Sequence, residues 1–134
     1  MPNSTSPITG TTMTFRKTMT VAEQALFTGI SGNLAPLCVD ASAARRAGFD
    51  NALCFELALA SLATTALNRV AGADWRIGAI TLDFKAAVPV GSTLEASVTV
   101  ADVASNAIRC DVRCEMQGRG TVIAGSATLV PVAA

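Results

Sequence analysis

Residues 53–70 read LCFELALASLATTALNRV, and this stretch decides the fold. Every side chain from 57 to 67 is apolar or small, so a helix formed here has almost no polar face to present to water and must be enclosed by protein on most sides. The apolar run is about half the ~20 residues that a membrane-spanning helix needs. The stretch therefore predicts a buried central helix, with Asp50 or Asn51 as its N-cap and Gly72 just past its end.

Downstream of this helix the hydrophobic period changes from 3.6 to 2. Apolar and polar residues alternate over 80–85, 94–100 and 108–116, and a further apolar run covers 121–130. Cys110 and Cys114 share one face of the third run with Ile108, Val112 and Met116, so they are interpreted as sheet core. Four strands joined by short turns after one long helix predict an α+β domain in which an antiparallel sheet wraps around the helix.

Upstream, the pattern predicts a strand over 14–20 and then a short helix to about residue 29, opened by a capping box of Thr20 and Glu23. Gly, Asn and Pro predict a loop over 30–37, and a helical turn over 39–47 stops at Gly48. Residues 1–11 are rich in Ser, Thr, Pro and Gly and are predicted to be a flexible tail. The remaining residues, 12–134, are long enough for one domain only.

The composition excludes several kinds of chemistry. The 134 residues contain no histidine and no tyrosine, so no Ser-His-Asp triad, Cys-His pair, histidine-ligated zinc or tyrosine acid can be built within this chain. Ten basic residues balance ten acidic ones without a basic stripe or interleaved aromatics, which argues against nucleic acid and membrane surfaces as partners. The groups that remain available for chemistry are carboxylates, thiols, hydroxyls, backbone amides and the side chains of a partner.

The four cysteines indicate a reducing compartment. They lack CxxC spacing, and the first residues show neither a basic segment nor an apolar one of the kind that signal peptides carry. We therefore expect a cytoplasmic protein with reduced thiols. A bridge between Cys38 and Cys54, or a metal site shared by them, lacks further ligands in the sequence.

Two stretches carry a family resemblance. Residues 84–100, FKAAVPVGSTLEASVTV, resemble the F-x-x-P-V-x-x-G-D-T-L signature of MaoC-like hot-dog proteins, and residues 30–40, ISGNLAPLCVD, are similar to the hydratase motif S-G-D-x-N-P-x-H-x-D of that family. The order of elements also agrees over about residues 14–131. The resemblance implies a hot-dog fold and the lyase chemistry of R-specific enoyl-CoA hydratases and 3-hydroxyacyl thioester dehydratases. It implies no cofactor beyond the coenzyme A or acyl-carrier pantetheine of the substrate.

The residues that do chemistry in the family are replaced here. The Asp and His that hold and activate a water fall on Asn33 and Cys38, and a His-Gly pair that opens the central helix falls on Cys54 and Phe55; four motif positions match, namely Ser31, Gly32, Pro36 and Asp40. An asparagine orients a water but does not accept its proton, and a thiol with a reference pKa of about 8.5 is a poor base unless it is acidified. Ordinary hydratase chemistry is therefore expected to be impaired, whereas thioester binding by backbone amides of Phe55 or Glu56 at the helix start is retained.

Each candidate also has a structural interpretation. Asn33 is a turn former, Cys38 and Cys54 behave as small hydrophobic residues, and Glu56 suits the first turn of a helix. Thr64 either contacts substrate or bonds back to its own helix. Asp40 fits a cap or a loop anchor.

Three functions remain open. The first is an acyl-thioester-binding protein related to hydratases, with Asn33, Cys38 and Glu56 at a divergent catalytic site and Cys54, Phe55 and Thr64 in substrate contact. The second is a non-catalytic subunit that pairs with an active homologue, and the third is an acyl-CoA thioesterase that uses Glu56. Hot-dog domains generally join sheet edges, so we expect a homodimer or a hetero-oligomer with a homologous subunit.

Overall fold

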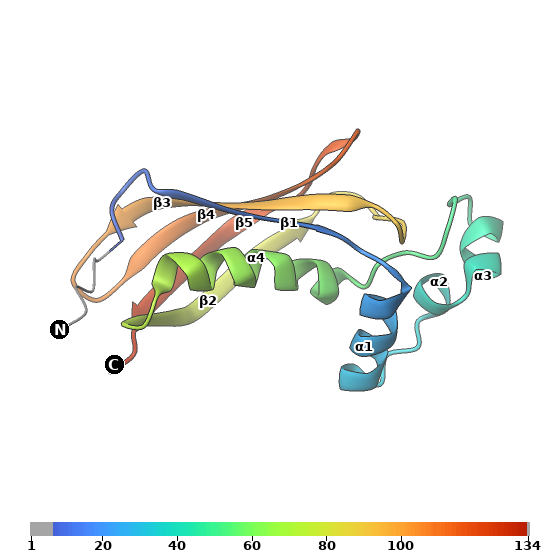
Figure 1. Ribbon diagram of the computed structural model, residues 1–134, viewed down its shortest axis with the longest axis horizontal. Helices are drawn as coiled ribbons and strands as arrows, with labels where there is room; N and C mark the ends of the chain where they lie inside the picture. Colours follow the sequence, from blue (N-terminus) through green and yellow to red (C-terminus); the bar gives the residue numbers. More distant parts are fainter. Residues whose placement is uncertain (1–6, 134) are drawn as a thin grey trace.

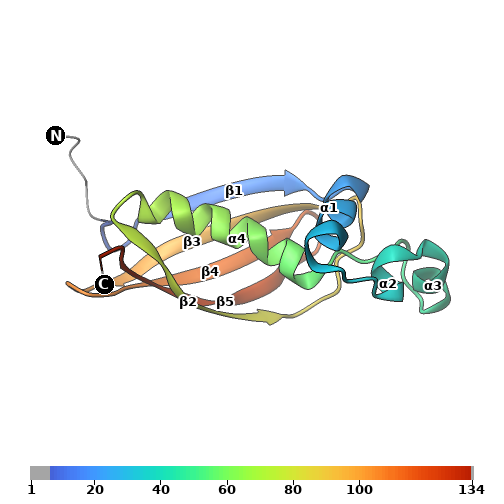
Figure 2. The ribbon, with the colours of Figure 1, turned by 90° about the horizontal axis from the view of Figure 1, so that it is seen from below.

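A five-stranded antiparallel sheet curls around helix α4 (Glu56–Ala71) in the computed structural model, which describes residues 7–133 (Figures 1 and 2). The strands lie in the order β1-β3-β4-β5-β2, with bounds β1 (Thr12–Thr18), β2 (Trp75–Phe84), β3 (Thr93–Val103), β4 (Ile108–Met116) and β5 (Gly120–Pro131). Three short helices, α1 (Val21–Ser31), α2 (Pro36–Val39) and α3 (Ala41–Arg46), lie at one end of the sheet. The α+β prediction is confirmed.

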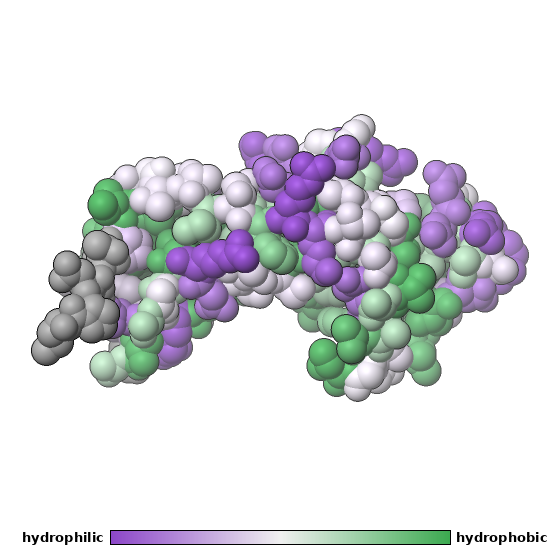
Figure 3. Space-filling model, in the orientation of Figure 1, coloured by the Kyte–Doolittle hydropathy of each residue, from purple (hydrophilic) through white to green (hydrophobic). Residues whose placement is uncertain are grey.

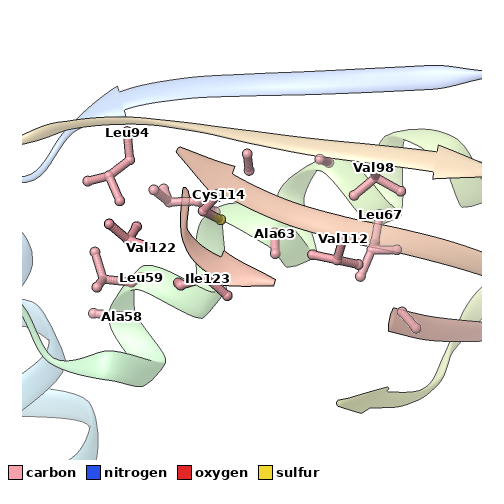
Figure 4. Packing of buried hydrophobic residues seen from close by; sticks show 14 of the residues in the cluster. Ala58, Leu59, Ala63, Leu67, Leu94, Val98, Val112, Cys114, Val122 and Ile123 are labelled. Carbon is pink, nitrogen blue, oxygen red and sulfur yellow. The ribbon is translucent and has the colours of Figure 1, made fainter. Parts of the chain in front are cut away.

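The core lies between α4 and the concave face of the sheet (Figure 4). Strand β4 alternates strictly between buried and exposed residues, and its buried set includes Cys110 and Cys114, both 0% exposed, as predicted. Small residues of α4, such as the fully buried Ala63 and Ala66, let the helix approach the sheet closely. The four cysteines are unpaired thiols.

The start of α4 differs from the prediction. Its N-cap is Phe55, which makes no side-chain capping bond. Asn51 instead accepts a hydrogen bond from the N–H of Ala52 (2.8 Å) and donates one to the carbonyl of Val90 (3.3 Å). Helix α4 therefore begins later than an Asp50 or Asn51 cap would allow, because residues 52–54 are extended and bonded to other segments. The predicted end is confirmed, since Gly72 caps α4.

Residues 88–91 hold this extended segment through backbone groups alone. The N–H of Cys54 donates to the carbonyl of Val88 (2.7 Å), and the N–H of Val90 donates to that of Ala52 (2.8 Å). The N–H of Gly91 donates to the carbonyl of Met19 at 2.7 Å. The start of α4, the end of β1 and the start of β3 are thereby joined at one place.

Helix α1 forms as its capping box predicts. The hydroxyl of Thr20 accepts the N–H of Ala22, and the Glu23 carboxylate accepts the N–H of Thr20. The Lys17 ammonium, 2.7 Å from that carboxylate, and its bonds from Thr20 lower the pKa of Glu23 to about 2. The helix runs two residues beyond the predicted end, to Ser31, and stops at Gly32, whose φ of 73° is left-handed.

Several boundaries of the predicted elements are wrong for local reasons. The first two residues of the loop expected over 30–37 belong to α1, and the last two belong to α2. Helix α2 begins at Pro36 because proline suits the first position of a helix. The following turn is the separate helix α3, capped by Asp40, which accepts the N–H of Ser42 as a structural cap does. Strand β2 begins at Trp75, five residues before the predicted run at 80, because a register shift between Ile77 and Ala79 breaks the alternation.

The tail prediction falls partly outside the described residues, which begin at 7. Residues 10 and 11 already pair with β3, since the N–H of Gly10 donates to Val100 and the N–H of Val100 donates to Thr11. None of the helices within residues 7–133 has the length and apolar character that crossing a bilayer requires.

Candidate functional site

Helix α1 separates two apolar grooves. The α1–α2 groove, about 460 Å³, lies between α1, the two short helices and the segment before α4, and is lined by Val21, Gln24, Thr28, Leu34, Cys38 and Val90 among others. The α1–α4 groove, about 480 Å³, lies between β1, α1 and the first half of α4, and is lined by Phe15, Met19, Leu26, Phe27, Leu57 and Leu62 among others. Hydrophobic side chains gather over this end of the molecule (Figure 3). Either groove is large enough for a short acyl chain.

Gln24 is the feature of the site that the sequence did not reveal. It is 7% exposed and is the only buried polar side chain among residues 7–133. Its Nε2 donates to the carbonyls of Cys38 and Leu53, each at 2.8 Å, and its Oε1 accepts the N–H of Phe55 at 3.2 Å. One side chain on α1 thus joins α2 to the start of α4. Glutamine is ordinarily exposed, so nothing in the pattern of one short helix signals this burial.

Asn33 is exposed and turned onto its own loop. Its Oδ1 accepts the N–H of Ala35 at 3.0 Å, and its backbone carbonyl accepts the hydroxyl of Thr28. This is the local bonding of a turn-forming asparagine. The side chain lines neither of the two grooves beside α1.

Cys38 and Cys54 lie close together. The N–H of Leu53 donates to the carbonyl of Leu37 at 2.8 Å, which sets the two cysteine-bearing segments side by side. Cys38 is 7% exposed and lines the α1–α2 groove, whereas Cys54 is 3% exposed and belongs to the core. No group of three or more potential metal ligands occurs within residues 7–133, so neither thiol has the partners that a metal site needs.

The amino end of α4 has a free first turn. Glu56, its first residue, is exposed, and its carboxylate lies near enough to Cys38 to raise the pKa of that thiol, after the larger effect of burial. No side chain of the described residues caps the helix. The N–H groups of Glu56, Leu57 and Ala58 are the ones that a helix start leaves without an intrahelical partner. The N–H of Phe55 is already bonded to Gln24, so the expectation that it receives a carbonyl is corrected.

Phe55 and Thr64 serve the packing of the chain. Phe55 is 1% exposed, and its ring lies 4.7 Å from that of Phe27, so it closes the space between α1 and α4. The hydroxyl of Thr64 donates to the carbonyl of Ser61 (2.8 Å). Thr64 thus bonds back to its own helix, the structural interpretation given for it above. The structure therefore brings Cys38, Cys54, Phe55 and Glu56 around the start of α4, and leaves Asn33 and Thr64 apart from them.

We expect all four thiols to react slowly in the native protein. Burial raises the pKa of Cys54 to about 12 and that of Cys114 to about 11, and it raises those of Cys38 and Cys110 as well. At pH 8 the disulfide reagent DTNB should therefore label the native protein at least ~100-fold more slowly than the unfolded chain, with Cys38 first because it lines a groove. A native thiol that reacts at the unfolded rate would contradict this.

The same thiols make stability depend on pH in a defined direction. Burial holds the pKa values of these thiols in the native protein above those in the unfolded chain, so the unfolded chain loses its thiol protons first as the pH rises. Stability should be unaffected by the thiols below about pH 9 and should fall between there and about pH 12. Melting curves at increasing pH give the measurement.

The architecture just described, an antiparallel sheet wrapped around one long helix, is the hot-dog fold. A family model described as a MaoC-like domain matches residues 4–120. The chain therefore belongs to the MaoC-like domain family. A comparison with curated proteins finds none that matches.

Solved structures share this fold over nearly the whole chain. An (R)-hydratase from A. caviae involved in PHA biosynthesis is 25% identical, with 95% of this chain and 98% of that chain covered and a TM-score of 0.88. The R-hydratase PhaJ1 from Pseudomonas aeruginosa is 22% identical, covering 94% and 85%, with a TM-score of 0.86. The ChsH1–ChsH2 complex from Mycobacterium tuberculosis is 15% identical, covering 92% and 98%, with a TM-score of 0.83. The last two show the fold alone.

Proposed function

We propose that this protein binds an acyl thioester of coenzyme A or of an acyl carrier, and that it hydrates enoyl thioesters poorly. The observation that carries the binding is the apolar α1–α4 groove running from the uncapped first turn of α4. An acyl chain in this groove places its thioester carbonyl at the free amides of residues 56–58, where the helix dipole favours the developing negative charge. The similar hydratase from A. caviae supports this class of ligand.

Impaired hydration follows from the two positions that would hold the water. Asn33 is bonded to its own loop, and Cys38 lies in the α1–α2 groove with its pKa raised, so neither is a general base at neutral pH. Removing both members of a pair that acts as a unit abolishes most of the rate. A cytoplasmic location is part of the proposal, because four unpaired thiols suit a reducing compartment.

Two leucines test the binding and its place. Leu57 lines the α1–α4 groove and Leu34 lines the α1–α2 groove, and each is 67% exposed. Leu57→Asp should weaken butyryl-CoA binding at least ~tenfold in calorimetry, since it puts a charge where the chain lies, whereas Leu34→Asp should leave the affinity unchanged. If Leu34→Asp weakens binding and Leu57→Asp does not, the acyl chain lies in the α1–α2 groove instead. A wild type that does not bind would disprove the proposal.

Hydration is measured on the same preparation with crotonyl-CoA. We expect the double bond's absorbance to decay only slightly faster than it does without protein, although the ligand is bound. Turnover at the rate of an ordinary hydratase would contradict the impaired site.

Self-association is a second part of the proposal. Strand β2 pairs only with β5, so its outer edge is unpaired within residues 7–133, and Ile80 and Phe84 on it are 39% and 40% exposed. We propose that a second copy or a homologous subunit covers this edge, as the two-chain ChsH1–ChsH2 complex suggests. Sedimentation of the purified chain at micromolar concentration should give a dimer. A monomer there excludes the homodimer and leaves co-purification of a homologue as the remaining support.

A further inference from the structure

Gln24 meets three backbone groups that a side chain of another kind would not satisfy together. Two carbonyl oxygens, of Cys38 and Leu53, face its Nε2, and one N–H, of Phe55, faces its Oε1. A primary amide has two N–H groups and one carbonyl, so it fits this set in one orientation only. Cys38 lies in α2, whereas Leu53 and Phe55 lie in the segment that leads into α4.

The bond to Phe55 acts directly on the first turn of α4. Phe55 is the N-cap of that helix, and the residues after it carry the uncapped N–H groups. Its ring also packs on Phe27, which lines the α1–α4 groove. Fixing the N–H of Phe55 therefore fixes the helix start and the place of the ring that packs on Phe27 beside the groove.

We propose that Gln24 is a positioning residue of the thioester site: acting through Phe55, it sets where the free amides of residues 56–58 lie relative to the α1–α4 groove. The proposal rests on the proposed function, in which the thioester carbonyl of the ligand accepts hydrogen bonds from those amides. It does not make Gln24 a catalytic residue, because the side chain touches no reacting atom.

Gln24→Glu turns this geometry into a pH-dependent one. The introduced carboxylate still accepts the N–H of Phe55 but has no proton to donate to the two carbonyl oxygens. A hydrogen bond to one of these carbonyls therefore forms only when the carboxyl is protonated. The titratable groups around it are the thiols of Cys38 and Cys54, with the carboxylates of Glu23 and Glu56 acting on those thiols. Burial and the two nearby negative charges raise the pKa of the introduced carboxyl above its ordinary value of about 4.3.

The experiment measures butyryl-CoA affinity at pH 5 and pH 8 for the wild type, Gln24→Glu and Gln117→Glu. Gln117 is exposed in the turn before β5 and contacts only Arg16 through its side-chain oxygen, so it provides the matched control. We expect Gln24→Glu to bind at least ~tenfold more tightly at pH 5 than at pH 8, after division by the wild-type ratio, because a buried carbonyl regains a donor. The control should keep the wild-type ratio.

A merely structural role for Gln24 would not give this profile, since lost packing does not return on protonation. Equal corrected affinities at both pH values in a folded Gln24→Glu protein overturn the inference. If circular dichroism shows that Gln24→Glu is unfolded at pH 8, butyryl-CoA affinity is measured on Gln24→Met instead. Methionine keeps the length of the side chain and removes its hydrogen-bond donors. Wild-type affinity in Gln24→Met overturns the inference, and weaker binding at both pH values supports it.

Failure of the proposed function is visible separately. When the wild type does not bind butyryl-CoA, the function is wrong and the positioning is judged on amide resonances by nuclear magnetic resonance. The resonances of Phe55, Glu56 and Leu57 should move with the protonation of the introduced carboxyl in Gln24→Glu and not in Gln117→Glu. Resonances that stay fixed overturn the inference.

Discussion

Gly125→Ala should lower the free energy of unfolding by about 3 kcal/mol, the upper end for an overpacked site. A Cβ at this position would overlap the carbonyl oxygen of Thr81 and lie 2.9 Å from the Cα of Leu82. Both are backbone atoms of β2, which pairs with β5 at this point. Backbone cannot rotate away as a side chain can, so β2 must separate from β5.

The melting temperature should fall by about 10 °C, since 1 kcal/mol corresponds to about 3–5 °C for a domain of this size. Gly78→Ala is the matched control in the same strand pair. There the nearest atoms are Cγ1 and Cγ2 of Val130, at 2.8 and 3.1 Å, which belong to a side chain and can shift without moving the backbone of either strand. We expect a loss of about 1 kcal/mol or less for the control. Equal losses of unfolding free energy in Gly125→Ala and Gly78→Ala would show that β2 can move away from β5 at little cost.

Phe55→Ala should cost about 3–5 kcal/mol, as the loss of a buried aromatic ring does. The ring is 1% exposed and packs against Phe27 at a centroid distance of 4.7 Å. The bonds of Leu53 and Phe55 to Gln24 resist movement of this segment into the space that the ring leaves. Urea unfolding followed by circular dichroism gives the free energy, and the slope should stay that of the wild type.

Phe49→Ala is the control for this change. Phe49 is half-buried after α3 and lies outside the core cluster, so its truncation should cost about 1 kcal/mol or less. A Phe55→Ala protein as stable as the control would mean that the space between α1 and α4 is not close-packed.

The fold was predictable wherever side chains alone decide it. The run of small apolar residues in α4 requires burial, and the strict alternation of β4 requires one face inside. The box of Thr20 and Glu23 is a local device and forms locally. Strand β2 was found only from residue 80, because the register shift at Gly78 hides the period of its first half.

The positions of the candidate residues around the helix start were predictable from the sequence, and their contacts were not. Residues 54–56 lie at the helix start where the family resemblance put them, and Cys38 reaches the same region. The conformation of a three-residue turn decides whether the side chain of Asn33 faces a cavity or its own backbone. The amino-acid sequence of this turn is compatible with either conformation, and the structure has the second. The role of Gln24 depends on carbonyls far along the chain, 14 and 29 residues away, which no local pattern specifies.

The backbone junction around residues 88–91 makes the start of α4 tolerant of side-chain substitution. Three hydrogen bonds of Val88, Val90 and Gly91, which join main-chain atoms only, hold the segments around the entry to α4. Substitution changes side chains and leaves such atoms in place. Substitutions in the loop that carries Asn33 and Cys38 would therefore leave these bonds in place, so the scaffold at the start of α4 does not depend on which side chains the loop carries.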